Sequence, residues 1–169
     1  MASTDVLIDA FTRVKDAVPQ AITGLSARQL AFRQGGTSNS IAWLVWHLTR
    51  VQDSQVAGLA GIDQIWTTQG FFERFGLPLP PEDTGYGHDS AAVDSVVADA
   101  PLLLDYFEAV HARTIEYLGT LSEADLDRIV DTRWDPPVTA AVRLVSTVDD
   151  DLQHVGQAGY ARGLVPTDD

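Results

Sequence analysis

Apolar residues recur at the spacing of an α-helix in four long segments of this chain. The segments cover about residues 4–23, 39–60, 100–120 and 139–162. Each begins near a side chain that can accept a hydrogen bond from the first helical turn, and these are Ser3 or Thr4, the run 38–40, Asp99 and Thr139. No segment alternates between apolar and polar residues over more than a few positions, so we expect no β-sheet. The pattern predicts an all-α protein built as a four-helix bundle.

Shorter signals lie between the long segments. Residues 26–29 have the form of a capping box, which predicts a short turn of helix. Pro19 falls inside the first long helix, so we expect a kink or a break there. Residues 61–98 hold no long periodic element, only an aromatic stretch and a short helical signal near residues 90–97. A connection of this length usually has a role such as covering a site, and it forms a long crossover between the second and third helices.

The fourth helix places charged residues beside a predicted core stripe. On a helical wheel the core stripe contains Ala141, Leu144, Val145, Val148, Leu152, Val155 and Gly159. Asp150 and His154 lie on a second stripe, about 100° around the helix, with Asp151 beside it. This arrangement predicts a site at the edge of a groove. A purely solvated surface is the alternative interpretation.

Composition narrows the classes of partner. The chain has 169 residues, a formal net charge of −13 and no cysteine. We expect one domain over residues 1–169. The missing cysteines exclude disulfides, thiolate metal sites and a cysteine nucleophile, so any thiol would come from outside the protein. The negative charge argues against nucleic acid and anionic membranes as partners, and the chain start has no signal-peptide pattern, so we expect a cytoplasmic protein.

Three ionisable side chains on two helices form a candidate metal site. Asp150 and His154 are four residues apart, so they project from one helix face one turn apart. His47 is the only ionisable group in the apolar first half of the second helix and supplies a third ligand. His111, on the third helix, is assigned instead to the edge of the bundle. Structural zinc sites use four protein ligands, whereas three ligands with open positions are typical of catalytic sites.

Residues 41–48 (IAWLVWHL) and 150–157 (DDLQHVGQ) resemble motifs of the DinB/YfiT-like superfamily of metalloenzymes. The resemblance is closer to its mycothiol-dependent branch, which includes the maleylpyruvate isomerases. In the superfamily a histidine of helix two and an H-x-x-x-H pair of helix four, followed by x-G-Q, hold a divalent metal. His47 and His154 match this pattern, while Asp150 replaces the first histidine of the pair, as is common in the thiol-using branch. The resemblance also implies an up-down-down-up order of helices.

The resemblance further implies that a metal ion activates a low-molecular-weight thiol, such as mycothiol, for attack on a small electrophile. Zn²⁺ is the expected metal, and Ni²⁺, Fe²⁺ or Mn²⁺ would also accept two imidazoles and one carboxylate. Arg50, Arg162 and Gln157 are candidates for binding the substrate. Asp53 or Asp151 could orient a ligand imidazole, and Asp151 is also the reserve candidate for the carboxylate ligand.

Two other functions stay open at this point. The same three ligands and open position would serve a metal-dependent hydrolase that uses a bound water. The third candidate is a non-catalytic metal-binding bundle with a role in a stress response. An exposed face of the bundle could also support a homodimer, although the sequence shows no clean apolar patch.

Overall fold

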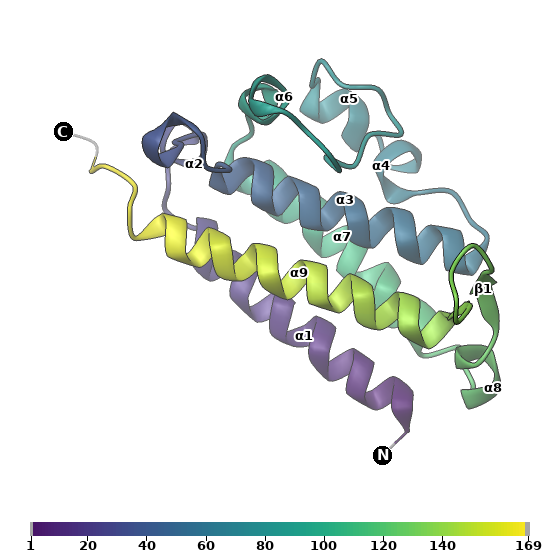
Figure 1. The fold of residues 1–169 in the computed structure, drawn as a ribbon. Helices are drawn as coiled ribbons and strands as arrows, with labels where there is room; N and C mark the ends of the chain where they lie inside the picture. The colour runs from purple at the N-terminus through teal and green to yellow at the C-terminus, as the bar shows by residue number, and fades with distance from the viewer. Residues whose placement is uncertain (1, 168–169) are drawn as a thin grey trace.

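Four long helices dominate the computed structural model, which describes residues 2–167. They are α1 (Ser3–Ile22), α3 (Ile41–Ala60), α7 (Ala100–Leu118) and α9 (Ala140–Arg162). The helices lie side by side, with α9 and α7 each packed against both α1 and α3 (Figure 1). The prediction of an all-α fold is confirmed. None of the described helices has the length and apolar character needed to cross a membrane.

Short elements fill the connections between the long helices. They are α2 (Ala27–Leu30), the 3₁₀ turn η1 (Gln34–Gly36), α4 (Ile65–Thr68), α5 (Phe71–Phe75), α6 (Ser90–Ser95), α8 (Glu123–Leu126), β1 (Ile129–Asp131) and β2 (Val138–Thr139). The two strands pair in antiparallel fashion, with Ile129 opposite Thr139. The expectation of no sheet was wrong here, because strands of two and three residues are too short to show an alternating pattern.

The helix starts follow the predicted caps in three of the four long helices. The side chains of Ser40, Asp99 and Thr139 accept hydrogen bonds from the backbone N–H groups of the first turns of α3, α7 and α9. The start of α1 differs, because the Ser3 hydroxyl donates to Glu123 at 2.8 Å instead of capping its own helix. Pro19 lies inside α1 without ending it, so the break considered at that position does not occur.

The buried face of α9 is rotated relative to the predicted core stripe. Its buried residues are Ala140, Leu144, Thr147, Val148, Asp151, Val155 and Ala158. Val145 and Leu152, which were placed in the core, are 57% and 42% exposed. A wheel gives only relative angles along one helix, whereas the neighbouring helices α1 and α3 decide which face is covered. The rotation carries Asp151 into the interior.

The crossover between α3 and α7 packs as a layer over these two helices. Its aromatic residues Trp66, Phe71 and Phe75 are buried and surround Tyr106 of α7, with ring centroids 4.9–5.9 Å from that of Tyr106. The segment of residues 81–88, which we call the strap, then lies against α3. It reaches the helix at His47 and Arg50, and so it takes part in the candidate site.

Candidate metal site

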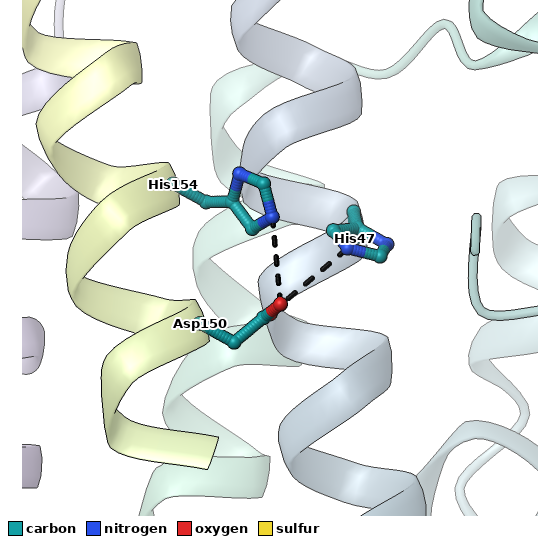
Figure 2. Close-up of side chains that lie close together, drawn as sticks. All are labelled: His47, Asp150 and His154. Atoms are coloured by element: carbon teal, nitrogen blue, oxygen red, sulfur yellow. Dashed lines mark ion pairs between the residues drawn. The ribbon is translucent and has the colours of Figure 1, made fainter. Parts of the chain in front are cut away.

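His47, Asp150 and His154 come together between α3 and α9 (Figure 2). The two helices are antiparallel, because Gln55 late in α3 contacts Arg143 early in α9, whereas His47 contacts the later turn of α9. Nε2 of His154 lies 3.5 Å from Oδ1 of Asp150, and Nε2 of His47 lies 3.9 Å from Oδ2 of the same carboxylate. One ligand atom from each of the three residues lies within 4.8 Å of the other two. The cluster could therefore hold a metal ion.

Each imidazole is oriented by a hydrogen bond on the side away from Asp150. Nδ1 of His47 donates to the carbonyl oxygen of Thr84 in the strap, and Nδ1 of His154 donates to Oε1 of Gln157 at 2.9 Å. Because both partners are acceptors, they hold a proton on Nδ1 and leave Nε2 of each ring as the nitrogen that faces the carboxylate. This is the tautomer that a metal-binding histidine needs. Gln157 was expected at the substrate, but here it contacts a candidate ligand.

The carboxylate supplies a direct test of whether the residues fit a cation. Oδ2 of Asp150 is buried and accepts no hydrogen bond from the described residues. A buried carboxylate oxygen without a partner is costly, and a cation between it and the two Nε2 atoms would satisfy it. Two imidazole nitrogens and one carboxylate oxygen are a donor set that Zn²⁺ and neighbouring divalent metals accept. The residues therefore fit a metal ion.

Burial and charge act differently on the two histidines. The His47 side chain is only 6% exposed, and burial lowers its pKa below the ordinary value. Asp150 raises the pKa of His154, against the opposing effect of partial burial. His47 is therefore neutral at pH 7, and its Nε2 lone pair is available to a metal without displacing a proton.

The strap is itself held in place by a chain of hydrogen bonds next to His47. The indole Nε1–H of Trp43 donates to Nδ1 of His88 at 3.0 Å, and Nε2–H of His88 donates to the carboxylate of Asp83 at 3.0 Å. Trp43 also stacks on His47, with ring centroids 4.5 Å apart. A Cβ added to Gly85 would lie 2.7 Å from Nδ1 of His47, so only glycine permits this approach. The strap thus packs closely against His47, a candidate metal ligand.

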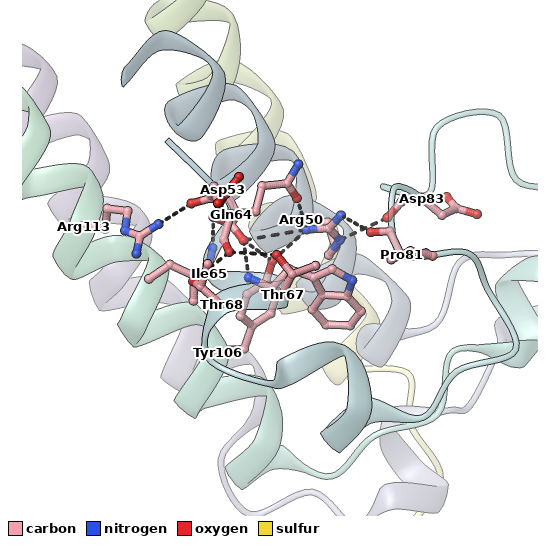
Figure 3. A network of polar contacts seen from close by, with 12 residues as sticks. Arg50, Asp53, Gln64, Ile65, Thr67, Thr68, Pro81, Asp83, Tyr106 and Arg113 are labelled. Carbon is pink, nitrogen blue, oxygen red and sulfur yellow. Dashed lines mark hydrogen bonds and ion pairs between the residues drawn. The ribbon is translucent and has the colours of Figure 1, made fainter. Parts of the chain in front are cut away.

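Arg50 and Asp53 form a buried network that joins α3 to the strap and to the start of α4 (Figure 3). Arg50 is fully buried, and its guanidinium donates to the carbonyl oxygens of Pro81 and Asp83 and to side-chain oxygens of Gln64 and Tyr106. It is therefore closed to a substrate, contrary to expectation, and fixes the strap instead.

Asp53 has a structural role in the same network. Its carboxylate accepts hydrogen bonds from the backbone N–H groups of Ile65 and Trp66 at the start of α4 and from the Tyr106 hydroxyl. It was expected to orient a ligand imidazole, but that contact is made by the Thr84 carbonyl and by Gln157. These three hydrogen bonds hold the carboxylate against α4 and Tyr106.

Asp151 and Arg162 also lie outside the cluster. Asp151 is fully buried, and burial raises the pKa of its carboxyl well above the usual range. Asp150, and not Asp151, is the carboxylate that lies beside Nε2 of both histidines. Arg162 donates to the carbonyl oxygen of Ala21 at the end of α1, at 3.2 Å. His111, expected at the edge of the bundle, is only 5% exposed.

A groove of about 370 Å³ opens beside Asp150 between α3, α9 and the loop that joins β1 to β2. It is lined by Val51, Gln55, Trp134, Val138, Val142, Arg143, Ser146, Thr147 and Asp150. Arg143 and Trp134 were not expected at the site. Nothing in the sequence marks them, because the folding of the 129–139 hairpin over the start of α9 is what brings them there.

The fold and site define an all-helical protein with a His–Asp–His cluster that could hold a metal ion beside an open groove. The sequence profile of the DinB superfamily matches residues 10–158, and the chain belongs to that superfamily. It is also similar to a solved structure described as the conserved protein of a locus from Enterococcus faecalis, with 34% identity, a TM-score of 0.91 and 98% of each chain covered. None of the curated proteins compared with the chain matches it.

Proposed function

We propose that this protein is a divalent-metal-dependent transferase that joins a low-molecular-weight thiol, such as mycothiol, to a small electrophile. The observation that carries the proposal is the convergence of the two Nε2 atoms on a carboxylate that has a buried, unpartnered oxygen and borders a groove. His47, Asp150 and His154 would hold the metal, with Zn²⁺ favoured. When bound, the ion supplies Lewis acidity, which lowers the pKa of a coordinated thiol or water.

The candidate ligands are already oriented for metal binding by other residues of the chain. Thr84 and Gln157 fix the orientation of the two imidazoles, so little rearrangement is needed on binding. The apolar side chains of Val51, Trp134 and Val142 line the part of the groove that would receive the electrophile. The protein has no cysteine, so the nucleophilic thiol comes with the cosubstrate.

The lining of the groove favours a thiol over water as the nucleophile. Among the described residues, Asp150 and Arg143 are the only charged side chains in this lining. A hydrolase commonly places a separate general base where it can take the proton of the attacking water, and no such carboxylate or imidazole lines the groove. A thiol, with an ordinary pKa near 8.5, gives up its proton far more readily and needs no such residue.

Turnover with a panel of thiols tests this proposal. The Zn²⁺-loaded protein would be mixed with a reactive electrophile such as monochlorobimane and, in separate reactions, with mycothiol, glutathione, cysteine and coenzyme A. We expect saturable conjugation with a sugar-based thiol, which Asp150→Asn abolishes and the neighbouring exposed variant Asp149→Asn retains. Hydrolysis of esters or amides without any thiol would support the hydrolase instead. Stoichiometric metal without turnover would support the non-catalytic bundle.

A further inference from the structure

The groove beside the metal cluster has a cation at its opposite end. Arg143 and Asp150 both line it and lie seven residues apart on α9, which corresponds to about 10 Å along the helix axis. Between them the wall is largely apolar, with Val51 of α3, Trp134 of the hairpin loop and Val142 of α9. The groove therefore has two polar ends and an apolar middle.

The charges at the Arg143 end do not balance. Arg143 donates to Asp131 at 3.1 Å, and Arg133 binds the same carboxylate at 2.7 Å. Both arginines hold the pKa of Asp131 well below its usual range, with Arg133 making the larger contribution. Two guanidinium groups against one carboxylate leave one positive charge at this end. In a chain with a net charge of −13, this local excess of positive charge is available to an anion.

The guanidinium of Arg143 is fixed in orientation and keeps N–H donors free for a ligand. Its second contact is to Oε1 of Gln55 at 3.0 Å, so it is fixed between α3 and β1. Among the described residues these two contacts occupy two of its five N–H donors. Its side chain is 26% exposed, in contrast to the fully buried Arg50. A planar group with free donors and access to a groove suits a carboxylate, which it can bind through two oxygens.

We infer that Arg143 binds the carboxylate of a small organic acid whose apolar body fills the groove and whose other end reaches Asp150. The size of the groove and the spacing of its ends suit an acid of about the length of 3-phenylpropionate. That this acid is the electrophilic substrate rests on the proposed function. Its binding at Arg143 does not, since Arg143 and its partners lie outside the metal cluster.

Binding of a matched acid and amide tests the inference on the full-length protein. The probes are 3-phenylpropionate and 3-phenylpropionamide, which differ only in the charged group. The readouts are calorimetry and the tryptophan fluorescence of the protein, to which Trp134 in the groove contributes. We expect the acid to bind at least about tenfold more tightly than the amide, both with Zn²⁺ and after chelation, because a charge-assisted pair is lost with the amide. Equal affinities in wild-type protein would overturn the inference without any variant.

Substitution of Arg143 tests whether the carboxylate of the acid binds at this residue. Arg143→Gln should remove most of the preference for the acid and leave the affinity for the amide within about threefold, because the apolar walls are unchanged. Arg128→Gln is the matched control, since it removes one exposed positive charge near the hairpin and does not line the groove. A preference that survives in Arg143→Gln would overturn the assignment. Acid binding without thiol turnover would leave this inference standing and count against the transferase proposal alone.

Discussion

His47 donates a hydrogen bond from Nδ1 to the carbonyl oxygen of Thr84, 37 residues further along the chain. This contact joins α3 to the strap and turns Nε2 of the same ring toward Asp150. Its geometry depends on Gly85, which allows the strap backbone to approach the imidazole, and on Arg50, which binds the strap from below. The candidate metal site is thus held in place partly by residues that are not part of it.

Replacing Asp150 and Asp151 of α9 by asparagine, one at a time, should show which of them is a metal ligand and which is a core residue. We expect wild-type protein to bind about one divalent ion per chain and Asp150→Asn to lose it, because an amide replaces the only anionic donor. Asp151→Asn should keep the ion, since the Asp151 carboxyl is buried in the bundle, where burial raises its pKa and favours the uncharged form, and Asp150 is the carboxylate beside both histidines. Metal analysis with circular dichroism as a folding check measures both. Loss of metal in Asp151→Asn alone would reverse the assignment.

Removing the acceptor from Gln157 should weaken metal binding without removing a ligand. In Gln157→Leu, Nδ1 of His154 loses its partner, so the tautomer with Nε2 free is no longer favoured, and we expect the metal affinity to fall about 10- to 100-fold. Competition with a chromophoric chelator would measure it. Gln157→Glu keeps an acceptor and should retain tight binding. Gln153→Leu, one turn earlier on the exposed face, is the control and should bind metal like wild type.

A single methyl group on the strap should disturb His47. Gly85 has φ of +92°, and its added Cβ would meet the imidazole, so Gly85→Ala should cost about 1–3 kcal/mol of stability and also weaken metal binding. Gly87→Ala is the matched control, because φ is +76° and the space beside it is open. It should show a similar backbone cost and normal metal affinity. Denaturant unfolding and metal titration of both variants test this. Equal metal affinity in the two variants would show that the strap does not influence metal binding.

The buried His111 should make stability depend on pH. Burial lowers its pKa to about 4, with a further contribution from Lys15, whereas the unfolded chain titrates near 6.5. Between these values the unfolded state binds more protons, so stability is lost as pH falls through this window. We expect a contribution of about 2 kcal/mol between pH 7 and pH 4.5. Urea unfolding of wild type and His111→Met, both in chelator, should show the smaller loss in the variant. Identical pH dependence would contradict the prediction.

Much of the secondary structure and the three candidate ligands could be predicted because they depend on local sequence. Helical spacing and cap residues such as Ser40 and Thr139 act within a few positions, so they mark helix starts without knowledge of the fold. The four-residue spacing of Asp150 and His154 also fixes them on one helix face. The partner His47 stood out as the only ionisable group in the apolar first half of the second helix, and the resemblance to the superfamily to which the chain belongs supported this choice.

The roles of the surrounding residues could not be predicted, because they depend on contacts between distant parts of the chain. Arg50 lies one helical turn after His47, and nothing in the local sequence shows that the strap binds and covers Arg50. The same holds for Arg143, which lines a groove only because the 129–139 hairpin folds beside α9.

The sequence by itself determined the helices, the all-α fold and the pairing of Asp150 with His154 on one turn, since each follows from backbone hydrogen bonding and helical periodicity. Only the tertiary structure decided which of the three aspartates faces His47 and which of them is buried. It also decided which arginine is open to a ligand. The physical reason is that each residue advances about 100° around a helix, so neighbouring side chains point in different directions. The rotation of α9 against α1 and α3 then exposes one aspartate to the site and buries the next.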